Sequence, residues 1–346
     1  MRQAKIRGTR PGGIPVGSTL ALAFAAIALV ACGPDESSSN TPDPGADSDS
    51  AWPVSIEHKY GTTEISDEPE RVVTVGLTDH DALLALGIAP VGVTDWYGDH
   101  AHATWPWAQD ELGGAEPVVV GNATELNFEE IAALEPDVIV GLYSAMTEED
   151  YETLSGIAPT VAQPSDHVDY GIPWQELTRT VGQVVGQPEN ADALVNEVEE
   201  RFDKVRADYP EFKGASAAIA TPYEGIYVYS DDVANGRLLS SLGFELPDEL
   251  ADLIGDADGS SLSLERVDLL DVDLLVWLDA TDDEGPLGSA LYQNLDVHTE
   301  GRELLVESAS DLGGAMSFSS ALSLPYLLDE LVPMLEVAVD GDPATS

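Results

Sequence analysis

Eight side chains that could bind a ligand stand at or just after the predicted β-strands of this chain, or at the start of a predicted helix. They are His80, Trp96, Tyr97, Tyr143, Tyr223, Arg237, Trp277 and Asp279. Ligands of open α/β sheets bind beyond the carboxyl ends of the strands, so this placement predicts a binding site. Five of the eight are aromatic, and an aromatic ring buries about 150–250 Å². The set therefore indicates a bulky ligand with apolar surface.

Histidine and carboxylate side chains make a weaker case for a bare metal ion. The chain has six histidines, and only His100 and His102 lie close in sequence, beside Asp99. They stand in a Trp-rich loop without the helical spacing of a metal site, and clustered His and carboxylate ligands are what zinc or manganese requires. We predict no metal site built by the protein, and a bare transition metal stays an alternative ligand.

Catalytic motifs give little support to an enzyme. The sequence has no Gly-x-Ser-x-Gly, Ser-x-x-Lys, His-Glu-x-x-His or P-loop pattern. The acid pairs Asp231-Asp232 and Asp282-Asp283 are the kind that glycoside hydrolysis uses. A chain with 64 acidic residues contains such pairs by abundance, so a secreted carboxylate-dependent hydrolase is only the alternative from another functional class.

Short β-rich runs alternate with helical stretches, which predicts an α/β architecture with mostly parallel sheets. The predicted strands are residues 71–75, 91–93, 117–120, 137–142, 217–220 and 273–278. The predicted helices between them are residues 81–86, 128–134, 238–242 and 264–270. These elements bring the candidate ligand-binding residues to the ends of the strands.

An internal repeat predicts two similar lobes with the ligand cleft between them. Residues 126–140 align with 262–276 at a constant offset, and residues 83–88 align with 239–244 in the same order. A solenoid repeats every 20–50 residues, so this longer period indicates one lobe repeated once.

A helical segment joins the two lobes. Residues 173–212 contain an apolar helical stripe that runs from about Pro188 to Ala207. About 20 helical residues span about 30 Å, which makes a stiff connection. We therefore place the first lobe at residues 53–172 and the second at 213–346.

The amino terminus has the polarity of an export signal. Residues 1–31 carry four basic and no acidic residues, and an apolar run ends in Leu29-Val30-Ala31-Cys32. This tetrapeptide resembles a bacterial lipobox, and Cys32 is the chain's only cysteine. We predict a lipoprotein signal peptide at residues 1–31 and a flexible tether at 32–52. The lipid on Cys32 would anchor the protein at the extracytoplasmic face of the cell membrane.

The net charge excludes several kinds of partner. The chain has 64 acidic and 14 basic residues, a formal charge of −50. Nucleic-acid binding requires clustered Lys and Arg, so no nucleic acid is expected, and anionic lipid surfaces are disfavoured for the same reason. With a single cysteine, no intrachain disulfide can form.

Three stretches carry a family resemblance. They are Asp95-Trp96-Tyr97 with Trp105-Pro106-Trp107-Ala108, residues 169–174, and residues 318–326. With the lipobox, the two lobes and the joining helix, residues 53–335 resemble the substrate-binding lipoproteins of ABC importers. The similar subgroup has a long interlobe helix and handles iron–siderophores, haem and vitamin B12. Actinobacterial-type ferric siderophore binders are the most similar.

The resemblance implies a monomeric binding protein that takes a ferric siderophore to an ABC permease dimer. The siderophore would supply the iron's ligands, and no cofactor is expected. Haem and cobalamin stay alternative ligands. Glu129 and Glu265 occupy equivalent repeat positions and match the family's paired glutamates, which contact arginines on the two transmembrane subunits. Only Arg237 is placed to meet ligand charge, which favours a hydroxamate over a catecholate siderophore.

Overall fold

The computed structural model describes residues 52–223, 225–280 and 285–341. The predicted signal peptide, Cys32 and the tether up to residue 51 lie outside the described residues. Trp52, the last residue of the predicted tether, packs against the core of the first lobe. The folded part therefore includes Trp52. Within the described residues, no helix is both long enough and apolar enough to cross a membrane.

A six-stranded sheet forms the first lobe, in the order β6-β5-β4-β3-β7-β8. Its strands are β3 (Val72–Thr74), β4 (Gly92–Asp95), β5 (Val118–Asn122), β6 (Glu125–Leu126), β7 (Val138–Gly141) and β8 (Thr160–Ala162). Neighbouring strands are parallel except at the β5–β6 edge. The hairpin β1 (Val54–His58) and β2 (Gly61–Ile65) precedes them.

Both faces of this sheet are covered. Side chains alternate along a strand, so Val138 and Val140 of β7 pack on one face while Ile139 packs on the other. The first face carries the β1–β2 hairpin and α1 (Asp79–Ala85) and α4 (Trp174–Val184); the second carries α2 (Phe128–Ala133) and α3 (Glu148–Ser155). Strands buried on two faces appear in the sequence as unbroken apolar runs, and β3, β4, β5 and β7 were predicted in this way, whereas β6 and β8 were not.

The second lobe has a five-stranded sheet in the order β11-β10-β9-β12-β13. Its strands are β9 (Ala217–Thr221), β10 (Ile226–Tyr229), β11 (Gly259–Leu262), β12 (Leu274–Leu278) and β13 (Glu303–Val306). The pairs β9–β12 and β12–β13 are parallel, whereas β10 is antiparallel to both neighbours. The α/β fold class with two lobes is thus confirmed, and the second sheet is mixed.

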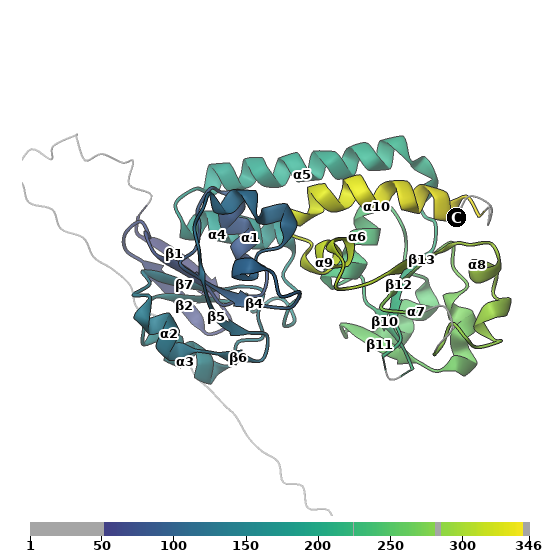
Figure 1. The fold of residues 1–346 in the computed structure, drawn as a ribbon, viewed down its shortest axis with the longest axis horizontal. Coiled ribbons are helices and arrows are strands. Elements are labelled where there is room, and N and C mark those ends of the chain that lie inside the picture. The colour runs from purple at the N-terminus through teal and green to yellow at the C-terminus, as the bar shows by residue number, and fades with distance from the viewer. Residues whose placement is uncertain (1–51, 224, 281–284, 342–346) are drawn as a thin grey trace, which may run out of the picture. The chain divides into compact units, whose positions relative to one another are not determined.

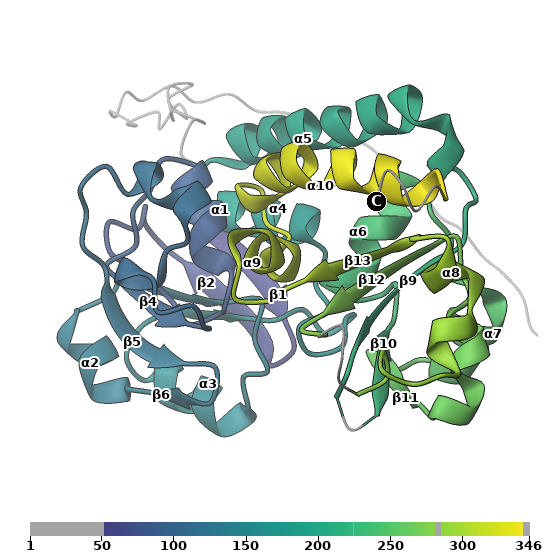
Figure 2. The same cartoon turned by 45° about the vertical axis from the view of Figure 1, so that its right-hand side comes forward.

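Helices also cover both faces of the second sheet (Figures 1 and 2). They are α5 (Pro188–Asp208), α6 (Ala234–Leu242), α9 (Asp311–Phe318) and α10 (Ser323–Val339) on one face, and α7 (Asp248–Ile254) and α8 (Asp296–Thr299) on the other. Short 3-10 helices complete the chain at Ala101–Ala103, Pro106–Ala108, Asp110–Leu112, Pro210–Phe212, Leu264–Leu270 and Tyr292–Asn294.

The helix α5 connects the two lobes. It has 21 residues and is therefore about 31 Å long. Gly182 of α4 lets it approach closely, because a Cβ there would lie 2.3 Å from the Cβ of Ala191. Further along, Val195, Val198 and Phe202 pack into the core of the second lobe. Figure 1 shows α5 and α10 running side by side above that lobe.

The predicted repeat has a structural counterpart at two helix ends. In α1 the N–H of Ile88 donates to the carbonyl of Leu83, and in α6 the N–H of Phe244 donates to that of Leu239. Gly87 and Gly243 take positive φ values of 76° and 108° at these ends. Both helices therefore end in the same glycine-dependent motif.

The second repeated helix differs from its prediction. Residues Leu264–Leu270 form a 3-10 helix with a non-helical Arg266, whereas the equivalent α2 is α-helical. The Asn127 side chain caps α2 by accepting from the N–H of Glu130, but Ser263 makes no such bond. Without a cap, the first turn of the second copy lacks the bond that favours regular α-helix.

Asp79 links α1 to the strand end of β7. Its buried carboxylate accepts the backbone N–H groups of Leu142 and Tyr143 at 2.7 and 2.9 Å. Gly76 makes room for it, since a Cβ there would lie 2.2 Å from Asp79 Oδ2. Burial raises the pKa of Asp79 from 3.8 to about 6, although the two hydrogen bonds act to lower it.

This pKa predicts a pH-dependent contribution to stability. Between pH 3.8 and about 6 the folded protein holds a proton on Asp79 that the unfolded chain has lost. The contribution is therefore full below pH 3.8 and is lost as the pH rises through about 6. Its size is on the order of 2–3 kcal/mol. Urea unfolding of wild type and of Asp79→Asn gives the difference between their free energies of unfolding. This difference should fall by that amount from pH 4 to pH 7, which is about one pH unit above the folded-state pKa. A difference that stays constant with pH would contradict it.

Candidate ligand-binding site

Two of the three stretches that carry the family resemblance meet in one aromatic cluster, and Tyr170 of the third packs against it at Tyr143. We define it by Trp96, Tyr97, Trp105, Trp107, Tyr143 and Phe318. Phe318 ends α9 in the second lobe, and its ring centroid lies 5.5 Å from Trp96 and 5.4 Å from Trp107 in the first lobe. The cluster therefore joins the lobes through ring contacts.

A cavity of about 390 Å³ opens beside this cluster, and we name it the cleft pocket. It is lined by Leu77, Trp96, Ala123, Tyr143, Asp169, Tyr170, Tyr229, Val233, Ala234, Asn235, Asp258, Leu278, Ser308 and Ser317. Residues from both lobes form its walls, and its volume is that of a small-molecule site.

The strand ends of the first sheet build one wall of the cleft pocket. Leu77, Trp96, Ala123 and Tyr143 follow β3, β4, β5 and β7, respectively. These four strands run parallel, so their carboxyl ends reach the same edge of the sheet. The expected ligand position beyond the carboxyl ends thus coincides with a cavity.

A second cavity of about 520 Å³ continues from the first, and we name it the side pocket. It shares Leu77, Ala123 and Tyr170 with the cleft pocket and extends over the turn between β5 and β6. Glu125 and Asp150 are its charged lining residues. A ligand larger than the cleft pocket could extend into it.

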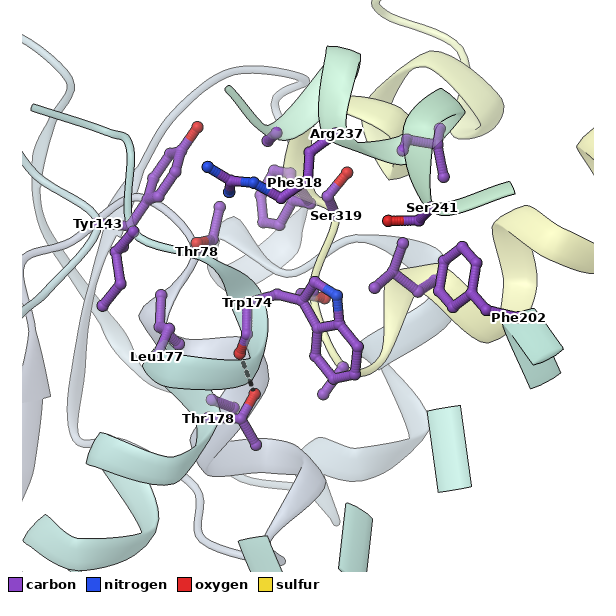
Figure 3. Close-up of a pocket in the computed structure, with 17 residues that line it drawn as sticks. Thr78, Tyr143, Trp174, Leu177, Thr178, Phe202, Arg237, Ser241, Phe318 and Ser319 are labelled. Carbon is purple, nitrogen blue, oxygen red and sulfur yellow. Dashed lines mark hydrogen bonds between the residues drawn. The ribbon is translucent and has the colours of Figure 1, made fainter. Parts of the chain in front are cut away.

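A third, narrow space of about 20 Å³ lies next to the cleft pocket, and we name it the inner pocket (Figure 3). It shares Tyr143 and Ala234 with the cleft pocket. Arg237 extends its guanidinium toward the ring of Tyr143, while Trp174 and Phe202 lie on the other side. Apolar side chains nearly fill this space, so it has no room for a bulky ligand in this conformation.

The guanidinium of Arg237 is already bonded. Its Nη2 donates to the carbonyl of Gly171 at 3.1 Å and to that of Asp232. Burial lowers the pKa of Arg237, and the nearby Asp232 acts to raise it. The arginine thus ties α6 of the second lobe to the segment before α4.

The phenols of the site are held in their neutral form. Burial raises the pKa of Tyr97 to about 12 and raises the pKa of Tyr143 further. Burial also raises the pKa of Tyr229 and Tyr170. Near pH 7 these groups therefore carry O–H donors, which can bond to the oxygen atoms of a ligand.

A buried carboxylate connects the two lobes behind the aromatic cluster. Asp81 Oδ2 accepts from Trp107 Nε1 at 2.9 Å and from the hydroxyl of Ser320. Ser320 follows Phe318 by two residues, and Ser319 between them has a φ of 41°. The bond to Asp81 therefore holds the turn that places Phe318 in the cluster. Asp81 was not among the residues predicted for the site, although an acid beside His80 in a buried helix was a signal.

Only some of the eight predicted residues line a pocket in the structure. Trp96 and Tyr143 line the cleft pocket, and Arg237 lines the inner pocket. Tyr97 is half-buried in the aromatic cluster, edge-on to Trp96 at 5.2 Å between ring centroids. Tyr229 was not among the predicted residues, and Tyr170 was named only as part of the stretch 169–174.

The side chains of Trp277 and His80 are fully buried and line none of the three pockets, so their contact with a ligand stays a prediction. Trp277 lies on the face of β12 that packs under α7, and its Nε1 donates to the hydroxyl of Tyr292 at 2.8 Å. The His80 ring packs edge-on against Phe318 at 5.8 Å between centroids. His80 therefore supports the aromatic cluster from behind.

Tyr223 and Asp279 stay predictions. Tyr223 is 63% exposed. Asp279 is exposed at the end of β12, and its Oδ1 accepts the backbone N–H of Ser308 at 2.7 Å. Neither residue lines the cleft pocket. Asp279 is nevertheless close to the pocket, because it follows Leu278 in the chain and bonds to Ser308, and both of these residues line it.

The histidines considered for metal binding make other contacts. The His100 ring packs on Trp105 at 4.1 Å between centroids, and His102 Nδ1 lies 3.2 Å from the carbonyl of Pro117. In residues 52–223, 225–280 and 285–341, no three His, Cys, Asp or Glu residues are grouped to hold a metal ion. The pair Asp282-Asp283 lies outside the described residues.

Glu129 and Glu265 are both exposed. Glu129 stands in the first turn of α2 and Glu265 in the first turn of the 3-10 helix Leu264–Leu270. Each is therefore accessible to a partner, one on each lobe.

Known proteins of similar sequence and structure include solute-binding proteins, two of which are named for siderophores or iron uptake. The chain is 27% identical over 329 residues to the probable siderophore-binding lipoprotein YfiY of Bacillus subtilis, covering 89% of this chain and 94% of the relative. A periplasmic solute binding protein from Mycobacterium smegmatis has 32% identity and a TM-score of 0.72, over 83% of this chain and 99% of the other. The iron uptake ABC transporter substrate-binding protein PiaA from Streptococcus pneumoniae has 25% identity and a TM-score of 0.70, over 83% and 100%.

A family model agrees with these likenesses. The periplasmic binding protein model matches residues 72–296, which run from β3 of the first lobe to the start of α8 in the second. The matched part thus contains both sheets except β13, together with the joining helix. The chain belongs to the periplasmic binding protein family.

Proposed function

We propose that this protein captures a ferric siderophore outside the cytoplasm and delivers it to an ABC importer for iron uptake. The observation that carries the proposal is the cleft pocket, a cavity of about 390 Å³ lined by aromatic residues of both lobes. The names of the relatives reported above support the same ligand class. The protein binds its ligand and hands it on unchanged.

The pocket suits the outside of a chelate. Trp96, Tyr143, Tyr170 and Tyr229 offer ring faces to the apolar chain of the siderophore. The phenols of the three tyrosines and the hydroxyls of Ser308 and Ser317 can donate hydrogen bonds to the oxygen atoms of the siderophore. The siderophore itself provides the ligands of the iron, so the protein recognises the whole complex.

Docking to the permease uses Glu129 and Glu265. A two-lobed protein that meets a pore of two subunits can make one contact per lobe. An exposed glutamate paired with an arginine makes a charge-assisted, bidentate hydrogen bond. One copy of the protein supplies both contacts.

The membrane anchor is a lipid on Cys32. The lipobox and the cysteine lie outside the described residues, so the support for the anchor is the sequence alone. Mass spectrometry of protein extracted from membranes should find a diacylglycerol-modified amino-terminal peptide that begins at Cys32. An unmodified peptide, or one that begins elsewhere, would contradict the anchor.

A fluorescence titration tests ligand capture. Trp96 lines the pocket and Trp105 and Trp107 lie behind it, so bound ferric complex should quench their emission. Titration with ferric hydroxamates, ferric catecholates, haem and cobalamin should give saturable quenching by a ferric siderophore, with the ligand recovered intact. Saturation by haem or cobalamin alone would contradict the proposal, and ligand recovered as a cleavage product would indicate an enzyme.

A further inference from the structure

Acidic side chains provide the formal charges that line the cleft. Asp169 and Asp258 line the cleft pocket, and Glu125 and Asp150 line the side pocket. In the described part of the chain, the residues that line these two cavities include no Lys or Arg. Asp169 and Asp258 are both exposed, so a ligand that enters the cavity can approach their carboxylates.

Two cations near these residues, Lys59 and Arg237, are already bonded within the protein. Lys59 Nζ lies 3.0 Å from Asp169 Oδ1 and partly neutralises that carboxylate. Arg237 lines the inner pocket (Figure 3), and its guanidinium donates to the carbonyls of Gly171 and Asp232. Neither cation is held free for an anionic ligand in the cleft pocket.

Carboxylates of the second lobe act on the phenol of Tyr229, which lines the cavity. Burial raises its pKa, and the carboxylates of Asp279 and Asp258 raise it further. Asp279 also raises the pKa of Tyr97 in the aromatic cluster, after burial. Acidic groups thus act on the pocket from the second lobe, while Asp169 acts from the first.

We infer that the cleft selects ferric complexes by charge, and that it prefers a cationic tris-hydroxamate to neutral and anionic forms of the same chelate. The inference rests on the proposed siderophore capture. Three hydroxamates neutralise Fe³⁺, so a pendant ammonium group leaves the complex at +1, whereas three catecholates leave it at −3. Carboxylates attract the first and repel the second.

The expected effect of each unit charge is moderate. Two unit charges 4 Å apart interact by about 1 kcal/mol in water and more strongly near protein, and salt screens them beyond about 8 Å. Only the carboxylates near the cavity therefore contribute, and the chain's overall charge of −50 acts mainly at longer range and low salt. We expect about a three- to tenfold change in affinity per unit of ligand charge.

A series of one chelate at three charges tests the inference. Ferrioxamine B carries +1 through its free amine, its N-acetyl derivative is neutral, and its N-succinyl derivative is −1. In calorimetry at 50 mM salt, the +1 complex should bind most tightly and the −1 complex most weakly. At 500 mM salt the differences between the three affinities should become smaller. Equal affinities, or tightest binding of the succinyl form, would overturn the inference.

Matched variants distinguish the effect of the cleft carboxylates on ligand affinity from the effect of the chain's overall charge. Asp258→Asn and Asp169→Asn keep an acceptor for Tyr227 and for Gln163, and each should narrow the gap between the +1 and −1 ligands about threefold or more. Glu200→Gln removes an exposed acid of α5 that lines neither cavity, and it should leave the gap unchanged. An equal effect in all three variants would overturn the local explanation.

The failures of the two proposals are distinguishable. If ferric triscatecholate binds and no member of the ferrioxamine series does, siderophore capture stands and the charge inference is wrong. If neither class binds, the proposed function fails, and the charge inference fails with it.

Discussion

Cells that carry Glu129→Ala and Glu265→Ala together should import the ferric siderophore at least about tenfold more slowly than wild type. Truncating one partner of a hydrogen-bonded charge pair at an interface costs about 2–5 kcal/mol, and here one pair is lost on each lobe. Both residues are exposed and neither lines the cleft pocket. The affinity of the purified double variant for the ligand should therefore stay within about twofold of wild type, well under 1.4 kcal/mol.

A matched control uses acids of the same two elements. Glu130 lies beside Glu129 in α2, and Asp268 lies in the 3-10 helix of Glu265; both are exposed. The double variant Glu130→Ala with Asp268→Ala should import at the wild-type rate. Normal uptake in the Glu129 and Glu265 variant, or a loss of ligand affinity with it, would show that these glutamates do not dock the permease.

Replacing one aromatic residue on each wall of the cleft pocket should weaken siderophore binding by about a hundredfold. Trp96 and Tyr229 line the cavity from the first and the second lobe. Loss of a well-packed aromatic anchor costs about 1–3 kcal/mol, so Trp96→Ala and Tyr229→Ala should each weaken binding and their costs should roughly add. Calorimetric dissociation constants for the single and double variants give the measurement.

Folding must be separated from binding in this experiment, because Trp96 also packs in the aromatic cluster. Trp96→Phe keeps a ring and should recover most of the affinity, and thermal unfolding should show both variants folded. Leu291→Ala removes an exposed apolar side chain that lines neither the cleft pocket nor the side pocket and should bind as wild type. Full affinity in the folded double variant would place the ligand elsewhere.

Much of the first lobe could be predicted from local sequence patterns. Its strands are buried on both faces, so they appear as apolar runs, and their parallel direction puts Trp96 and Tyr143 at one edge. The same pattern does not decide which face of the sheet carries Trp277. A residue within such a strand can lie on either covered face, and Trp277 lies on the face away from α5 and α10.

The second wall of the cleft was harder to predict. Tyr229 ends β10, which is antiparallel to both neighbours, so the rule for the carboxyl ends of parallel strands does not reach it. The bond from Ser320 to Asp81 joins residues 239 positions apart. A contact at this separation leaves no local pattern, and it depends on how the lobes pack.

Anomalous diffraction at the iron edge, from crystals grown with a bound ferric siderophore, tests the central claim most directly. We expect one iron peak inside the cleft pocket, among Trp96, Tyr143, Tyr170 and Tyr229, with all of the iron's ligand atoms supplied by the siderophore. An iron ion coordinated by protein side chains, or an iron peak outside this cavity, would contradict it.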